Sequence, residues 1–389
     1  MNLFIKIYII LCVALIVFDL AFLAIKNIRN FEFYPRNKKL EKRIRDEIVL
    51  HREFGSFSPN FLRDMNRLLS KTQNLITLHS ELERAPYAKE WFRPVVLAQI
   101  DSYMKKSDYE QAFYTYVVST FDYSAEPIPP NFADQFITFL DSSSLYTFSN
   151  TMNALYAFGQ VNLLLLGIEK VNERGKFYHK KLLTDGILAS KVDQVELTKR
   201  LVERFFCYSP HVQDCLLDIF RMGKGDAAIL CKSLMTNSEI SEQVRYSAMR
   251  YFIKHPDNYS RSFFVYRLKD ENAPWVEQML SIQAMGAYSD DEAYQLVKSK
   301  ATSRHWYVRT NAVEYLHRNG ISCEEIAEIL QTQDRYAGEA LLYQYRDDHE
   351  MTLFIIRTIQ EIAAQAENRK NEQNQPIFEA EKEVASNIV

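Results

Sequence analysis

Residues 303–320 read SRHWYVRTNAVEYLHRNG, and within them Val308, Ala312 and Leu316 follow one another at intervals of four residues before Gly320. Positions i, i+4 and i+8 lie along one face of an α-helix, so this spacing predicts a helix with a single apolar stripe. A glycine shortly after the last apolar residue is a common helix stop. One such helix cannot bury its stripe alone and needs a neighbour of similar kind.

The same stripe recurs upstream with a period of 32 residues. Its members are Val212, Leu216, Phe220, Val244, Ala248, Phe252, Val276, Leu280, Ala284, Val308, Ala312 and Leu316, and we refer to them as the repeat-core residues. Each stripe is followed by a short polar separator and a second helical segment. Helix pairs repeating every 20–50 residues are typical of an α-solenoid, in which stacked pairs share one continuous core.

The sequence therefore predicts an all-α fold, with an α-solenoid of antiparallel helix pairs over residues 131–366. Only 10 glycines and 11 prolines occur in 389 residues, which favours long helices. The segment SAEPIPPN (124–131) interrupts the helical pattern and is the predicted boundary with a helical region at 59–130. The polar end, 367–389, is predicted to be disordered, with QPIFEAEKEV (375–384) as a candidate docking segment.

Two of the copies carry a family resemblance. WYVRTNAVEYLHRNG (306–320) and SEQVRYSAMRYF (241–252) resemble the second helix of HEAT repeats, especially the short HEAT-like class of the phycobilisome lyases. The resemblance covers residues 205–335. It implies a structural role for Arg245 and Arg309, through hydrogen bonds within the stack, with ligand contact as the alternative. Gln213 and Glu277 replace the arginine in the other copies and depart from the family pattern.

Trp275 and Trp306 recur at helix starts, 31 residues apart. We expect them to pack between repeats, with a peptide-binding groove as the alternative role.

The N-terminal part carries a different pattern. IYIILCVALIVFDLAFLAI (7–25) is nineteen residues long and has one charged residue, Asp19. An apolar run of about 18 residues or more is long enough to span a bilayer, so we predict a transmembrane anchor within residues 1–26. A cleaved signal peptide, which would leave a secreted protein, is the alternative. Asp19 is a candidate intramembrane contact to another membrane helix, or a carboxylate tolerated near the membrane surface.

Basic residues follow this run, in a segment at 27–58 that we expect to lie beside the membrane. The candidate lipid contacts are Lys26, Arg29, Arg36, Lys38, Lys39, Lys42, Arg43 and Arg45. The positive-inside rule then predicts a single-pass protein of the cell membrane, with its N-terminus outside and its C-terminal domain cytoplasmic.

Motifs for catalysis or metal binding are missing from the sequence. The eight histidines form no HExxH, the five cysteines form no CxxC, and no phosphate-binding glycine loop occurs. The net charge of −3 does not favour a nucleic-acid partner. We therefore expect no metal, no cofactor, no nucleic acid and no enzymatic activity.

We hypothesise that the protein is a scaffold that binds another protein. The helices at 210–222, 241–254, 273–286 and 305–319 are expected to form a surface that binds a protein partner, one associated with the membrane. This layout resembles membrane-anchored bacterial HEAT-repeat proteins that accompany envelope or polysaccharide (glycosyltransferase) machinery. The alternative is an enzyme of lyase or hydrolase type, acting on a small ligand in the groove of the solenoid.

Overall fold

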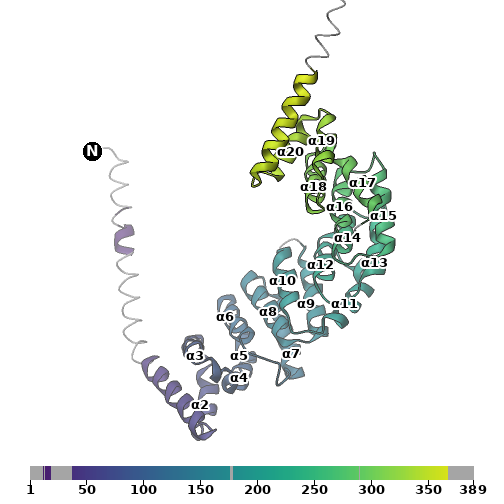
Figure 1. Ribbon diagram of the computed structural model, residues 1–389. Helices are drawn as coiled ribbons and strands as arrows, with labels where there is room; N and C mark the ends of the chain where they lie inside the picture. The colour runs from purple at the N-terminus through teal and green to yellow at the C-terminus, as the bar shows by residue number, and fades with distance from the viewer. Residues whose placement is uncertain (1–11, 13, 19–36, 176–177, 289, 367–389) are drawn as a thin grey trace, which may run out of the picture. The chain divides into compact units, whose positions relative to one another are not determined.

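The computed structural model describes residues 12, 14–18, 37–175, 178–288 and 290–366 of the chain (Figure 1). Within these ranges every regular element is an α-helix or a short 3-10 helix, and none is a β-strand. The all-α prediction is therefore confirmed for the described residues.

The transmembrane part of the predicted fold is corrected by the structure. None of the helices in the described ranges is both long enough and apolar enough to cross a membrane. Spanning a hydrocarbon core takes about 20 consecutive apolar residues in one helix, whereas of residues 7–25 only 12 and 14–18 are described. The predicted single-pass location, with an outside N-terminus and a cytoplasmic C-terminal domain, is corrected with it. Asp19, Lys26, Arg29 and Arg36 lie outside the described residues.

The other basic residues of this region belong to a helix at 37–54. Its buried stripe is Leu40, Ile44 and Ile48, spaced at i, i+4 and i+8 like the repeat core. Its opposite face carries Lys38, Lys39, Lys42, Arg43 and Arg45, which are exposed to solvent. Arg43 also pairs with the Asp64 carboxylate at 2.8 Å, and Arg45 pairs with Glu81 at 3.3 Å. These arginines therefore hold this helix to the helices that follow it.

The chain divides into two compact units, residues 1–197 and 198–389. The division falls within α11 (Gln194–Glu203) and differs from the predicted boundary at 130/131. The first unit also contains α2 (Phe61–Leu68), α3 (Thr72–Arg84), α4 (Lys89–Leu97), α5 (Ile100–Tyr103), α6 (Asp108–Ser119), α7 (Pro130–Phe136), α8 (Leu145–Phe158), α9 (Val161–Arg174) and α10 (Lys180–Ala189). The proline segment does not end this unit, because Pro130 starts α7 and Ile128 is buried.

The second unit is a run of helix pairs. They are α12 (Pro210–Met222), α13 (Ala228–Thr236), α14 (Glu242–Lys254), α15 (Asn258–Lys269), α16 (Trp275–Met285), α17 (Asp291–Ser299), α18 (Trp306–Arg318), α19 (Cys323–Gln331) and α20 (Arg335–Gln344), followed by a helical segment at 349–366.

These pairs form two layers (Figure 1). Helices α12, α14, α16, α18 and α20 each pack against the next one along, and we call them the motif layer. Helices α13, α15, α17 and α19 form the second layer, and each packs against the motif helix that follows it in the chain. The arrangement is compatible with the predicted α-solenoid. Helices α12, α14, α16 and α18 lie at the four positions that the 32-residue period predicts.

The core of the motif layer is the repeated stripe. All repeat-core residues except Val276 are buried, most of them completely. Val276 is half-buried, since α16 begins at Trp275, directly after Pro274, and Glu277 takes the buried position in its first turn. Small residues at Ala248 and Ala312 let neighbouring helices approach closely across the stripe.

A charge placed on this stripe tests the stacking. Ala312 is fully buried on α18, so Ala312→Asp should lower the free energy of unfolding by roughly 3–5 kcal/mol, the cost of an unpaired buried charge. Thr310→Asp, two residues earlier and partly exposed, is the control and should change stability little. Urea unfolding followed by circular dichroism measures both. Equal stability of the two variants would contradict the stacking.

Thiol reactivity gives a second test of the packing. Cys207 and Cys323 are exposed, whereas Cys215 and Cys231 are buried, and burial raises the pKa of the Cys231 thiol. The thiolate is the reactive form, so alkylation of the native protein should modify Cys207 and Cys323 first. Cys215 and Cys231 should react only when denaturant is added. Peptide mass spectrometry locates the labels, and early labelling of Cys231 would contradict its burial in α13.

Candidate docking surface

Exposed aromatic side chains gather at the starts of three consecutive motif helices. Trp275 opens α16, Trp306 and Tyr307 open α18, and Tyr336 lies in the first turn of α20. Their exposed fractions run from 38% to 58%. Because these helices stack side by side in one direction, their starts lie along one edge of the motif layer. We call these four residues the aromatic row.

The rings of this row contact one another across repeats. The Trp275 and Tyr307 rings are stacked, with centroids 5.2 Å apart and planes 16° apart. The Trp306 ring meets Tyr307 edge-on at 4.8 Å, and the Arg309 guanidinium lies 5.2 Å from the Tyr336 centroid. Offset stacking and cation–π contacts of this kind hold rings in defined positions. Trp275 thus links α16 to α18, whereas Trp306 contacts Tyr307 of its own helix, and both tryptophans present a face to solvent.

Beneath the row, Arg309 is buried and donates to the Ser303 carbonyl at 2.6 Å, within its own repeat. The equivalent Arg245 pairs instead with Glu277 of the next repeat, at 3.5 Å. Arg267 of α15 approaches the same carboxylate at 2.8 Å. Glu277 is therefore the buried counterion that joins α14, α15 and α16. Both arginines are engaged in packing.

A second buried carboxylate, Asp214, connects the preceding two motif helices, α12 and α14. Asp214 of α12 accepts hydrogen bonds from Gln243 Nε2 at 2.9 Å and from Ser247 Oγ at 2.5 Å, both on α14. A buried carboxylate needs such donors, so it fixes how α14 sits on α12.

The other ends of the motif helices enclose a hollow of about 450 Å³. It is lined by Ile253, Ile282, Gln283, Gly286, Asn311, Glu314, Tyr315, Arg318 and Asn319. Gln283 donates to the Asn311 side chain at 2.9 Å, and Arg318 pairs with Glu314. The motif layer thus has an aromatic edge at the helix starts and a polar hollow at the helix ends.

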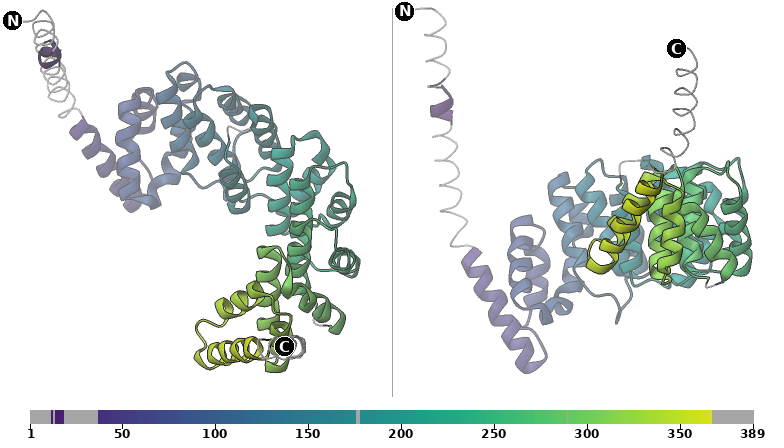
Figure 2. Two further views of the ribbon diagram at one scale, coloured as in Figure 1. Left: turned by 90° about the horizontal axis from the view of Figure 1, so that it is seen from above. Right: turned by 45° about the horizontal axis from the view of Figure 1, so that its top comes forward.

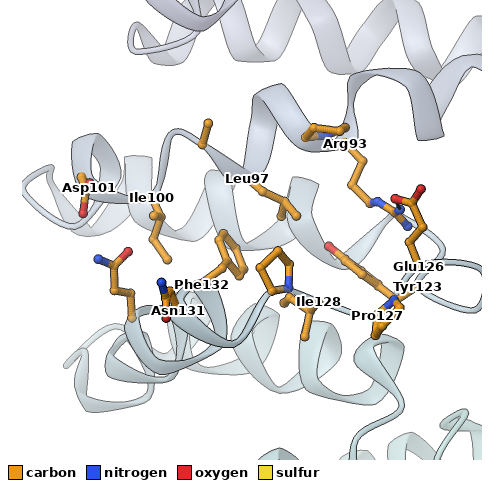
Figure 3. Close-up of a pocket in the computed structure, with 14 residues that line it drawn as sticks. Arg93, Leu97, Ile100, Asp101, Tyr123, Glu126, Pro127, Ile128, Asn131 and Phe132 are labelled. Carbon is orange, nitrogen blue, oxygen red and sulfur yellow. Dashed lines mark hydrogen bonds and ion pairs between the residues drawn. The ribbon is translucent and has the colours of Figure 1, made fainter.

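The first unit has its own cavity of about 520 Å³, between α4, α5, α7 and the proline segment (Figure 3). Leu97, Ile128 and Phe132 give it an apolar floor. At one end the buried Arg93 pairs with Glu126, while Asp101 lies at the opposite end (Figure 3).

Arg93 has further partners at that end. It pairs with Glu90 at 2.8 Å and donates to the Asp122 carbonyl. Arg93 and Glu126 of this cavity are therefore paired with each other, and Asp101 lies apart from them.

In the part of the chain that the structure describes, no three histidine, cysteine or acidic side chains come together in a way that could hold a metal ion.

Sequence reasoning missed Tyr307 and Tyr336 as surface residues and missed Glu277 as a partner of Arg245. The signal for the row was present, because an aromatic residue recurs near the starts of three motif helices, at 275, 306 and 336. The pairing of Glu277 has no local signal, since its two arginines come from other helices.

Comparisons with known proteins found no match. No family model, no curated protein and no solved structure matches this chain.

Removing the counterion tests the buried cluster. Glu277→Gln leaves Arg245 and Arg267 without their shared carboxylate and should lower the free energy of unfolding by about 3 kcal/mol. Glu271→Gln, on the exposed turn before α16, is the matched control. Chemical denaturation measures both variants. A Glu277 variant as stable as its control would show that the cluster does not join the repeats.

Proposed function

We propose that this protein is a non-enzymatic helical-repeat scaffold that binds a protein partner along the aromatic row. The observation that carries the proposal is the row itself, in which large aromatic rings remain exposed on neighbouring helices. Monomeric proteins rarely leave contiguous aromatic surface in water unless it has a partner. Tryptophan and tyrosine are also enriched among the residues that dominate binding energy at protein interfaces.

The frame beneath the row supports the same proposal. The row stands on helices whose stripes are buried, apart from the half-buried Val276, and whose first turns are tied by Glu277 and Arg309. Rings already held by stacking lose little freedom on binding, so more of the contact energy contributes to affinity. A protein segment with apolar or aromatic side chains is the partner that suits such a surface.

The enzyme alternative has weaker support. A catalytic site would bring ionisable groups together in a recess, with some of them available to a substrate. In the cavity of the first unit Arg93 is held by Glu90 and Glu126. In the hollow of the motif layer Arg318 pairs with Glu314.

We also propose that the repeats belong to the HEAT-like class. The 32-residue period, the antiparallel helix pairs and the buried Val, Ala and Leu stripe support this assignment.

A site-specific photocrosslinker distinguishes this surface from the rest of the unit. Placed at Trp306 or Tyr336 in the full chain, it should yield one defined adduct with a protein partner in cells that express the protein. The same group at Ile229 or Tyr259, which are exposed on the second layer, provides the control. Adducts that form equally at both sets of positions would contradict the proposal.

The affinity of the identified partner then tests the individual rings. Trp306→Ala should weaken binding by at least about 30-fold, as expected when a residue worth roughly 2 kcal/mol is lost. Ile229→Ala should leave the dissociation constant unchanged. Isothermal titration with the purified partner gives both values.

A further inference from the structure

The helical segment at 349–366 ends the described part of the second unit with apolar side chains in solvent. Leu353, Ile356 and Ile359 are 46%, 38% and 36% exposed. In a stack of helix pairs such a face is covered by the following repeat, or by a capping element. This end of the stack therefore presents a surface of the kind that the earlier repeats bury.

A groove of about 350 Å³ lies between α20 and the 349–366 segment, and Ile359 is one of the side chains that line it. The 349–366 segment is the yellow helix in Figure 2. Its walls come from two helix faces with matching spacing: Arg335, Gly338, Glu339 and Leu342 on α20, and Ile359, Ile362, Ala363 and Ala366 on the terminal segment, with Leu330, Gln333 and Asp334 at one end. Positions i, i+3, i+4 and i+7 form one face of a helix, so the groove runs along both helices.

Small residues let α20 and the 349–366 segment approach each other closely along this groove. Gly338 faces Ile359 so closely that an added Cβ would lie 3.3 Å from the Ile359 Cδ1 atom. Ala363 and Ala366 add little bulk on the opposite wall. The groove therefore has an apolar floor and room for side chains from another segment.

The chain itself supplies a segment of suitable composition. It continues from Ala366, which lines the groove, through residues 367–389. The first apolar cluster in that stretch is Ile377 and Phe378, and Ala380 and Val384 follow. The ten intervening residues reach up to about 35 Å when extended, enough to return the cluster along the groove.

We propose that residues 376–384 of this chain bind the groove between α20 and the 349–366 segment, in the place of a further repeat. The tether keeps the apolar cluster at an effective concentration in the millimolar range, so even a weak contact is mostly occupied. Ile377 and Phe378 supply the side chains that fill the groove.

Disulfide trapping in the full chain tests this proposal. The variant Ile359→Cys with Phe378→Cys, in a background of Cys12→Ser, Cys207→Ser and Cys323→Ser, should form an intramolecular disulfide under mild oxidation. Ile359 is partly exposed, so the substitution should not prevent folding. The matched control is Arg357→Cys with Phe378→Cys, because Arg357 is exposed on the same helix, on the side away from the groove.

The proposal expects the Ile359 pair to close at least about tenfold faster than the Arg357 pair, since only the first is brought together by binding. Equal rates for the two pairs would overturn it. Disulfides that join two copies, at a rate that rises with protein concentration, would also overturn it, because a second copy would then cover the groove. In the full chain, Phe378→Asp should raise the fluorescence of a dye that binds exposed apolar surface, and an unchanged signal would count against the contact.

Discussion

The structure depends on the fact that a short amphipathic helix pair cannot bury its own apolar stripe. Burying a valine, leucine or phenylalanine side chain contributes about 1.5–3 kcal/mol, but only when something covers it. In the second unit the cover for each motif helix is the next motif helix, from α12 to α20. Stability in such a stack is approximately a sum of repeats and of contacts between neighbours. The outer ends of the stack are consequently the places where apolar surface remains.

Polar contacts add specificity to this apolar stacking. Apolar side chains alone tolerate small slips between helices, whereas a buried carboxylate is costly unless its donors are in place. Asp214 and Glu277 each connect neighbouring repeats in this way. The same cluster underlies the first turn of α16, where Trp275 begins the aromatic row. The contacts that fix the stacking of α14, α15 and α16 thus also hold the start of α16, where the proposed binding surface begins.

A feature of this fold could be predicted from the sequence when it depends on nearby residues, and could not when it depends on contacts with other helices. The helix stripes could be predicted because four-residue spacing and a 32-residue period are properties of the chain itself. The exposure of Trp306 and the pairing of Glu277 could not, since both depend on side chains from other helices. The proline segment at 124–131 suggests a boundary by its composition, and only the structure shows that Ile128 is buried there and that Pro130 starts α7. The transmembrane prediction rests on hydropathy alone, and none of the helices in the described ranges is both long enough and apolar enough to cross a membrane.

Hydrogen exchange followed by mass spectrometry tests the shared core most directly, because amide protection reports the free energy of local opening. If neighbouring repeats cover one another, the amides of α14 and α16, in the middle of the motif layer, should exchange most slowly. Protection should then fall toward α20 and the 349–366 segment. Exchange in α14 and α16 as fast as in the separators between helices would contradict a core shared by the stacked repeats.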